Sequence, residues 1–339
     1  MVIEPALVTF PPRPQVREVA GTEQKRSTNH GKCARRLVSA GGLSHYLWTA
    51  KMPAKPDCVD PVPCRVHREH GLDMNDDVLI YVAYCPDGVL SPLHLLALQK
   101  YEVEGYRVVL VVNSGADRHD IDPGPNPSSI LIVRENVGFD FGAWGHAARI
   151  LDELETVHSV TFVNDSVAGP LGASNAKSTR EIVRDVAAEA VFMTQSSQIR
   201  PHCQSYYFAL KQEALRKGAL VVARGFHYYS DKNRVVLNEE TSLQSRLESL
   251  GIVTGIAFPN SEALVRGVNP VIHCWRELAR DGFPFFKVSM IPHEMVSIDD
   301  PQLAGFLGKE FLACLRAHLG KRAFSNVEPL RAKPSFIRP

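Results

Sequence analysis

The sequence has little net charge, few cysteines and no long apolar run. Its 38 Lys and Arg residues nearly balance its 37 Asp and Glu residues, so the formal net charge is +1 and no global field attracts nucleic acid or an anionic surface. No uninterrupted apolar run reaches the roughly 20 residues that a membrane-spanning helix needs. The seven cysteines are an odd number scattered along a long chain, which indicates a reducing compartment rather than a disulfide framework.

Signatures of targeting and of common phosphate-binding loops are also missing. The N-terminus, MVIEPALVTFPPRPQ, lacks the basic and then apolar order of a secretory signal. The chain has no G-x-x-x-x-G-K-[ST] motif and no G-x-G-x-x-G after its first predicted strand, which disfavours P-loop and dinucleotide-binding enzymes. Asp140-Phe141-Gly142 spells a kinase tripeptide, but the other kinase motifs are absent from the sequence. Any anionic ligand must therefore be held by local groups.

The pattern of the chain divides it into three parts. Residues 1–75 are Pro-rich, basic and weakly periodic, and we expect an irregular N-terminal extension with one helix near 35–51. A patterned domain covers 76–320, and 321–339 form a tail. Strands alternating with helices predict an α/β fold with a mainly parallel, Rossmann-type sheet flanked by helices. Strands are expected at 78–84, 106–112, 130–133, 160–163, 190–194, 205–210 and 252–258, and helices at 90–101, from about 147, 180–188, 212–217, 240–250, 272–280 and 302–320.

The central stretch, residues 134–171, places two polar clusters at the ends of strands. The segment NVGFDFGAW (136–144) follows the β-branched run 130–133, and its glycines predict a turn before a helix. The segment Asn164-Asp165-Ser166 follows the short strand 160–163. Ligands of open α/β sheets bind outside the carboxyl ends of strands, so we expect both clusters to face one crevice.

Several residues in these clusters have two interpretations. Asp165 is placed to hold a divalent cation, Mg²⁺ or Mn²⁺, that neutralises a diphosphate, or it forms an Asx turn that caps the strand. Gly138 and Gly142 either let a ligand approach the backbone or only let the turn form. The pair Glu239-Glu240 opens a predicted helix, where acids favour the helix dipole, or one of the two is a general base.

Five segments in this order, RENVGFDFGAW, FVNDSVAGPL, HCQSYYFALKQEAL, NEETSLQSRLESLG and NPVIHCWRELARDGFPFFK, resemble the rhamnan synthesis F family of polysaccharide glycosyltransferases. The resemblance covers about residues 77–295, and NVGFDFGAW and HCQSYYFALK are its specific parts. The family is similar to inverting glycosyltransferases with the GT-A fold. In that wider group an acidic pair reads E-D-x-x-L-x-x-R-L-x-x-x-G. Glu239, Glu240, Leu243, Arg246, Leu247 and Gly251 match this pattern, with Glu240 replacing the aspartate.

The chain departs from that group at two positions. The usual metal motif has carboxylates at its ends, whereas Asn164-Asp165-Ser166 has one in the middle, which puts a metal site in doubt. The second strand ends in Asn113-Ser114, where relatives often have an aspartate that faces the base. The specificity for one nucleotide over another therefore stays open.

The resemblance implies transfer of a sugar, rhamnose by analogy with the family, from a nucleotide-diphosphate donor to a hydroxyl of a surface polysaccharide, with inversion. It implies Glu240 as the base with Glu239 beside it, and a glycan or lipid-linked acceptor as partner. Helical geometry also favours Glu240, which lies three residues before Leu243 on the expected inward face. The remaining candidates have three roles. The donor-binding candidates are Asn136, Gly138, Asp140, Asn164 and Asp165, and Asp165 is also the metal candidate. The acceptor-binding candidates are His202, Gln204 and Ser205.

Two other functions stay open. A single carboxylate in the metal motif is also compatible with a non-catalytic GT-A-like module that binds nucleotide sugar or glycan. A methyltransferase would need an acid where Asn113 stands, which disfavours it. We expect a cytoplasmic protein without nucleic-acid partners, and the basic N-terminal segment leaves room for peripheral association with the inner face of the cell membrane.

Overall fold

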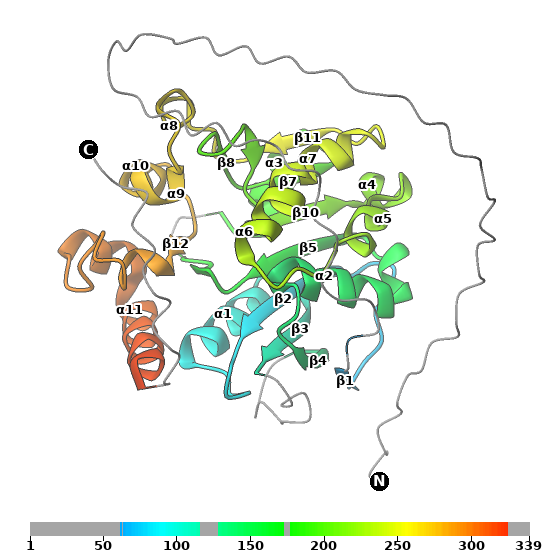
Figure 1. Cartoon of the computed structure of the whole chain (residues 1–339), viewed down its shortest axis with the longest axis horizontal. Helices are drawn as coiled ribbons and strands as arrows, with labels where there is room; N and C mark the ends of the chain where they lie inside the picture. The colour runs from blue at the N-terminus through cyan, green and yellow to red at the C-terminus, as the bar shows by residue number, and fades with distance from the viewer. Residues whose placement is uncertain (1–61, 63, 116–127, 173–176, 325–339) are drawn as a thin grey trace, which may run out of the picture. The chain divides into compact units, whose positions relative to one another are not determined.

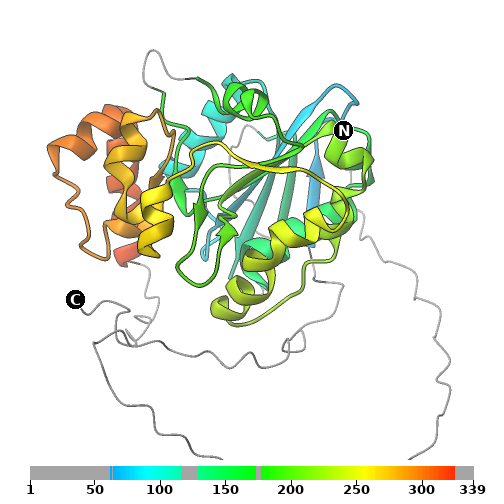
Figure 2. The same ribbon diagram turned by 90° about the horizontal axis from the view of Figure 1, so that it is seen from above.

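The computed structural model describes residues 62, 64–115, 128–172 and 177–324. The helix expected near 35–51 and most of the expected tail lie outside these residues. The described part is an α/β structure whose centre is a large sheet with helices on both faces (Figures 1 and 2). The predicted fold class is confirmed.

The large sheet has eight strands in the order β1-β4-β3-β2-β5-β10-β7-β11. β2, β3, β4 and β5 run parallel to one another, β7 and β11 are parallel to each other, and β1 and β10 pair antiparallel with their neighbours. The bounds are β1 Cys64–Arg68, β2 Asp77–Tyr84, β3 Arg107–Ser114, β4 Ile130–Glu135, β5 Ser159–Asn164, β7 Ala190–Phe192, β10 Tyr207–Lys211 and β11 Thr254–Ile256.

The central strand β2 is buried on both faces, as its continuous apolar sequence predicts. Val78, Ile80 and Val82 belong to the core on one face of the sheet. Leu79 and Tyr81 belong to the core on the other face. Successive side chains of a strand point to opposite sides, so a strand without polar alternation must be covered by helices on both.

The helices that cover the sheet follow from local sequence signals. Ser91 caps α1 (Pro92–Val103) in a capping box, and Pro92 occupies its first turn. α1 and α3 (Thr179–Asp185) contribute to the core on one face. α2 (Phe139–Ile150), α4 (Gln212–Arg216), α5 (Ala219–Arg224) and α7 (Thr241–Glu248) cover the other (Figure 2).

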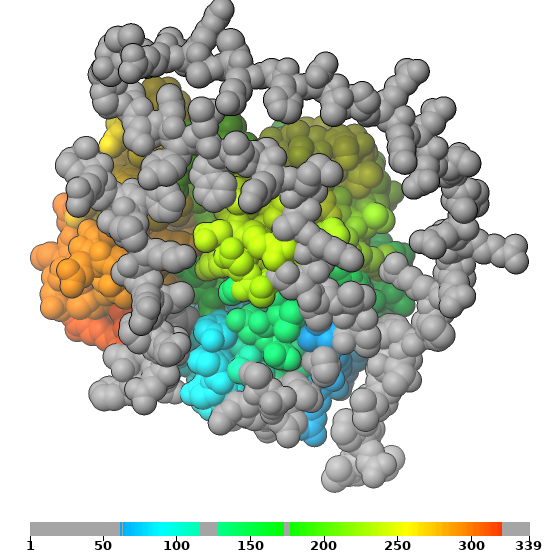
Figure 3. Space-filling view, viewed as in Figure 1, coloured from blue at the N-terminus to red at the C-terminus, as the bar shows by residue number. Residues whose placement is uncertain are grey.

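The start of the expected helix 240–250 differs from the prediction. α6 (Lys232–Val235) continues into η2 (Val236–Glu240), a turn of π-helix, before α7 begins. In the space-filling view the yellow-green atoms of α6 and η2 border the green atoms of α2 (Figure 3). The helical segment therefore begins earlier than expected and reaches the start of α2.

One segment of the expected irregular extension is part of the sheet. β1 pairs antiparallel with β4 in the register Cys64↔Arg134 to Arg68↔Ile130. The sequence CRVHR lies next to prolines, is basic and is only partly buried, which is typical of an edge strand rather than of a core strand. The absence of a strong apolar pattern explains why we expected no strand before residue 76.

The C-terminal part forms a third core beside α1. β12 (Phe286–Lys287) pairs antiparallel with β6 (Val167–Ala168), and α8 (Ser261–Arg266), α9 (Pro270–His273), α10 (Trp275–Arg280) and α11 (Pro301–Phe324) follow the large sheet. α11 is kinked at Gly308 and packs on α1 (Figure 1). Within the described ranges no helix is both long and apolar enough to cross a bilayer.

The topology places a switch point between β2 and β5. The chain proceeds from β2 outward through β3 to β4, and α2 then returns it to β5 on the other side of β2. In open α/β sheets the crevice outside the carboxyl ends of strands at such a point is the usual ligand site.

Candidate active site

A cavity of about 230 Å³ lies at the carboxyl edge of the sheet. It is bordered by the start of α2, the end of β5, the start of β10 and the segment from α6 to η2. Its lining is polar and contains two acids and two lysines. The polar lining residues are Asp140, Asn164, Ser166, Ser196, Gln198, His202, Gln204, Ser205, Lys232, Glu240, Asn269 and Lys287.

A chain of hydrogen bonds runs along the donor-side candidates. Lys287 Nζ donates to Ser166 Oγ at 2.9 Å, and Ser166 Oγ donates to Asn164 Oδ1 at 2.5 Å. Asn164 Nδ2 then donates to Asp140 Oδ2 at 2.8 Å. The polar clusters of the central stretch are therefore in direct contact, which confirms that they lie at one edge of the sheet.

The charge state of Asp140 is perturbed by its place in this cavity. Burial raises the pKa of its carboxyl to about 6. The positive charges of Lys232 and Lys287 oppose that rise in pKa, whereas the negative charges of Asp165 and Glu240 add to it. A carboxyl group that titrates near neutral pH in a polar cavity is a functional-site candidate.

Glu240 lines the cavity, and Ser205 holds one of its oxygens. The backbone N–H of Ser205 donates to Glu240 Oε1 at 3.1 Å, and the Ser205 hydroxyl donates to the same oxygen at 3.0 Å. Glu240 Oε2 accepts no hydrogen bond from the part of the chain that the structure describes. The carboxylate is thus oriented through one oxygen while the other remains for a ligand.

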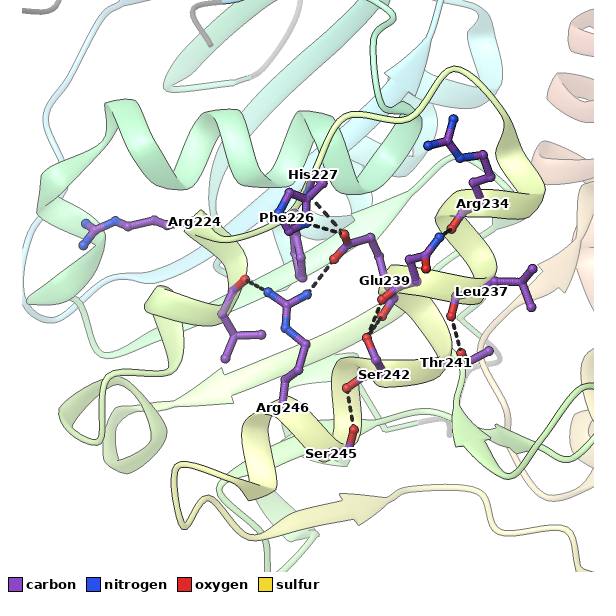
Figure 4. Close-up of polar contacts among 12 residues, drawn as sticks. Arg224, Phe226, His227, Arg234, Leu237, Glu239, Thr241, Ser242, Ser245 and Arg246 are labelled. Carbon is purple, nitrogen blue, oxygen red and sulfur yellow. Dashed lines mark hydrogen bonds and ion pairs between the residues drawn. The ribbon is translucent and has the colours of Figure 1, made fainter. Parts of the chain in front are cut away.

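The neighbouring acid, Glu239, has a different environment. It is 1% exposed, and its Oε1 lies 3.0 Å from Nδ1 of His227 while its Oε2 lies 2.6 Å from Nη1 of Arg246 (Figure 4). The backbone N–H of His227 also donates to Oε1 at 3.2 Å. Both oxygens of Glu239 are therefore used in structural contacts.

The acidic pair corrects the helical argument from the sequence. We expected Glu240 on the inward face of this helix, together with Leu243, Leu247 and Leu250. The buried acid is instead Glu239, and Leu250 is 39% exposed. Leu243 and Leu247 are buried as expected. The π-helical turn Val236–Glu240 changes the register, and adjacent helical residues lie about 100° apart around the axis. Hence one acid turns to the core and the other to the cavity.

The acceptor-side candidates all line the same cavity as Glu240. His202 is buried, and its Nδ1 lies 2.7 Å from the carbonyl oxygen of Arg200. A carbonyl oxygen can only accept, so Nδ1 donates in this contact and Nε2 is the ring nitrogen that remains for a ligand. Gln204 Oε1 accepts from the hydroxyl of Thr194 at 2.8 Å. These contacts hold both side chains in defined orientations.

The glycines of the turn serve packing rather than ligand approach. Gly138 has φ +78°, and a Cβ there would lie 2.7 Å from Cδ1 of Tyr228. A Cβ on Gly142 would lie 2.4 Å from the carbonyl oxygen of Val137 and 2.8 Å from the same ring carbon. The space above both glycines is filled by protein. Gly138 and Asn136 lie outside the lining of this cavity.

Arg134 and Asn113 hold this turn through hydrogen bonds from the ends of β4 and β3. The sequence did not predict this role for either residue. Arg134 is fully buried and donates to Asn113 Oδ1 at 2.7 Å and to the carbonyl of Val137 at 2.7 Å. Asn113 Nδ2 donates to the carbonyl of Phe139 at 3.3 Å. Asn113 is therefore a buried support of the turn.

Asp165 does not fit the metal site that the resemblance implies. Its Oδ2 accepts from the backbone N–H of Tyr84 at 2.9 Å and lies 3.3 Å from Nε2 of the buried His94. The residue is absent from the cavity lining, and the described ranges contain no group of three His, Cys, Asp or Glu residues that could hold a metal. Asp165 ties the end of β5 to the end of β2, so we derive no chemical step through a cation there.

The fold and the cavity define a class of protein, an α/β protein with a polar, mixed-charge cavity at the carboxyl edge of its sheet. A family model described as rhamnan synthesis protein F matches residues 108–318. The match covers more than half of the chain, so this protein belongs to the rhamnan synthesis protein F family, whose members are enzymes of polysaccharide biosynthesis.

Two relatives are similar to the chain at less than 30% sequence identity. Virulence protein VirA of Vibrio anguillarum (strain ATCC 68554 / 775) is 26% identical over 247 residues, which cover 63% of this chain and 79% of the relative. The uncharacterized protein y4gN of Sinorhizobium fredii (strain NBRC 101917 / NGR234) is 28% identical over 212 residues, 58% of this chain and 54% of the relative.

Proposed function

We propose that this protein is an inverting glycosyltransferase that moves a sugar, rhamnose in the first instance, from a nucleoside-diphosphate donor to a hydroxyl group of a surface polysaccharide. The observation that carries the proposal is Glu240, whose carboxylate lines a polar cavity at the switch point of the sheet with one oxygen held by Ser205. Membership of the rhamnan synthesis protein F family supports the substrate class.

Glu240 would act as the general base. Its Oε2 takes the proton of the acceptor hydroxyl while that oxygen forms a bond to the anomeric carbon of the donor. The bond from the anomeric carbon to the diphosphate breaks at the same time, and its electron pair goes to the leaving oxygen. A base held by two hydrogen bonds on its other oxygen loses little freedom when the acceptor binds, which favours reaction.

Asp140 and Asn164 would bind the donor sugar. A carboxyl and an amide side chain together offer acceptors and donors that suit sugar hydroxyl groups. The cavity volume of about 230 Å³ is below the ~300–1,000 Å³ of sites for whole drug-sized ligands. We therefore assign to it the sugar and the adjoining phosphates rather than the complete nucleotide.

His202, Gln204 and Ser205 would contact the acceptor, a glycan or a lipid-linked glycan. All three lie beside Glu240 in the lining, where an acceptor hydroxyl must be placed for the base to reach it. The His202 ring offers Nε2 for a hydrogen bond with a second hydroxyl of the same sugar.

The test is release of nucleoside diphosphate from a panel of dTDP-, UDP- and GDP-linked sugars by the full chain, with and without an oligosaccharide acceptor. We expect one donor to be turned over, faster with acceptor, and NMR to show the opposite anomeric configuration in the product. Donor binding by calorimetry without any release would instead identify a non-catalytic binding module. A product with retained configuration would exclude Glu240 as the base of a single displacement.

A further inference from the structure

Lys287 reaches the cavity from a distant part of the chain. It lies on β12, which pairs antiparallel with β6 so that Lys287 is opposite Val167. This pairing brings its Nζ to 2.9 Å from Oγ of Ser166, a residue 121 positions earlier. The hydrogen bond to Ser166 thus ties the Lys287 side chain to the turn that follows β5.

The ammonium group of Lys287 has unused donors. It forms no ion pair within the part of the chain that the structure describes, and its hydrogen bond to Ser166 uses one of its three N–H groups. The pKa of Lys287 is lowered to about 8, mainly by burial and also by the charge of the nearby Lys232, while the carboxylates of Glu240, Asp140 and Asp165 oppose this lowering. A sequestered cation without a paired anion is costly, and a bound anion would remove that cost.

A second cation lines the same cavity. Lys232 is the first residue of α6, and its charge acts on both Lys287 and Asp140. Two ammonium groups in one cavity repel each other unless an anion binds between them. The carboxylates of Asp140 and Glu240 offset part of this repulsion, but neither forms an ion pair with either lysine among the described residues.

We propose that Lys287 and Lys232 bind the diphosphate of the donor directly and stabilise it as the leaving group, in the role that a divalent cation would otherwise have. The inference rests on the proposed function. When the bond from the anomeric carbon to the diphosphate oxygen breaks, that oxygen gains the electron pair and a negative charge next to the two ammonium groups. The acceptor proton goes to Glu240, so neither lysine needs to transfer a proton.

The experiment is calorimetric titration of the full chain with UDP, dTDP and GDP, each in EDTA and in 5 mM Mg²⁺. We expect one of them to bind in EDTA with a Kd within about twofold of that in Mg²⁺. Lys287→Met should weaken binding by roughly 10- to 100-fold, the range for a charge-assisted hydrogen bond, and Mg²⁺ should not restore it. Lys287→Arg should recover part of the affinity, and Lys232→Met should weaken binding less.

Lys100→Met is the matched control, because Lys100 is a half-buried lysine of α1 that pairs with Glu310 outside the cavity. It should bind as the wild type does. Lys232 is exposed, so its variant tests the proposal even if Lys287→Met does not fold.

Binding that disappears in EDTA and returns with Mg²⁺ would overturn this inference alone. Binding of none of the three nucleotides by the wild type would overturn it together with the proposed function, and full affinity in both lysine variants would show that the diphosphate lies elsewhere.

Discussion

Glu239 Oε2 lies 2.6 Å from Nη1 of Arg246, and this ion pair is closed from solvent on the glutamate side, where the side chain is 1% exposed. The next residue, Glu240, lines the cavity and contacts Ser205. Two adjacent acids of the same type thus have separate tasks: one fixes the loop around His227 and α7 to the core, and the other is available to a ligand.

Replacing Glu240 with Gln should remove the base and leave the fold intact. The amide oxygen still accepts the hydrogen bonds of Ser205, so the free energy of unfolding should change by less than about 0.5 kcal/mol. The rate of transfer should fall by roughly 10²- to 10⁴-fold, as is typical when a general base is lost. The measurements are initial rates of nucleoside-diphosphate release with acceptor present, and urea denaturation. An unchanged rate would place the base elsewhere.

Glu239→Gln is the companion variant and should behave in the opposite way. It leaves Arg246, whose side chain is 30% exposed, without its counter-ion, and losing a charged partner in a partly buried contact costs about 1–3 kcal/mol. We expect a clear loss of unfolding free energy, with catalytic rate retained in the fraction that is folded. If Glu239→Gln instead lost activity at full stability, the roles of the two acids would be exchanged.

Asp165→Asn tests whether this residue is a structural tie or a metal ligand. The variant keeps an oxygen for the Tyr84 N–H but loses the charge that faces His94, so unfolding free energy should fall by about 1–3 kcal/mol. Nucleoside-diphosphate affinity should change by less than about threefold, because the Asp165 side chain does not line the cavity and acts on Asp140 and Lys287 only through its charge. Asp185→Asn is the control, because its ion pair with Lys177 is exposed and contributes little. Loss of Mg²⁺-dependent binding at full stability would restore the metal role.

Gly142→Ala tests the role of the glycine turn. The new methyl group would overlap the carbonyl oxygen of Val137 and the ring of Tyr228, and overpacking of this kind costs about 1–3 kcal/mol. Gly305→Ala is the matched control: it lies in α11 with nothing within 4 Å of the added Cβ, so alanine should stabilise the helix by about 0.5–1 kcal/mol. Urea denaturation measures both. If Gly142→Ala kept full stability and lost only nucleotide affinity, the turn would be a ligand contact instead.

The sequence predicted the elements whose signals are local. The apolar run of β2, the helical segment of α1 and the glycine turn before α2 each depend on residues within one segment, and all are present as expected. The shared edge of Asp140 and Asn164 also followed, because parallel strands end at the same side of a sheet. β1 was missed because an edge strand needs little apolar sequence of its own.

The site residues that the sequence missed depend on contacts between distant segments. Arg134 is an arginine at a strand end, and nothing in its neighbourhood indicates that it is buried between Asn113 and the turn. Lys287 becomes a cavity residue only through the pairing of β12 with β6. Tyr228 fills the space above two glycines from a loop more than 80 residues away. Such residues have no periodicity or spacing that would identify them.

The raised pKa of Asp140 predicts how stability depends on pH. Its pKa is 3.8 in the reference state and about 6 in the folded protein, so between these values the folded state holds a proton that the unfolded state has lost. The unfolding free energy that this group contributes is therefore fully present below pH 4 and declines as pH rises through 6. Asp140→Asn cannot ionise and its oxygen still accepts from Asn164, so it should match the wild type near pH 4 and exceed it at pH 7.5 by on the order of 2–3 kcal/mol. Urea denaturation of both proteins at pH 4, 5, 6 and 7.5 measures this difference.

Asp76→Asn is the control, because Asp76 lies outside the cavity and forms its ion pair with Arg107. A difference between Asp140→Asn and the wild type that stays constant across this range would show that the carboxyl group is ionised throughout, and that the cavity lysines neutralise it without a ligand.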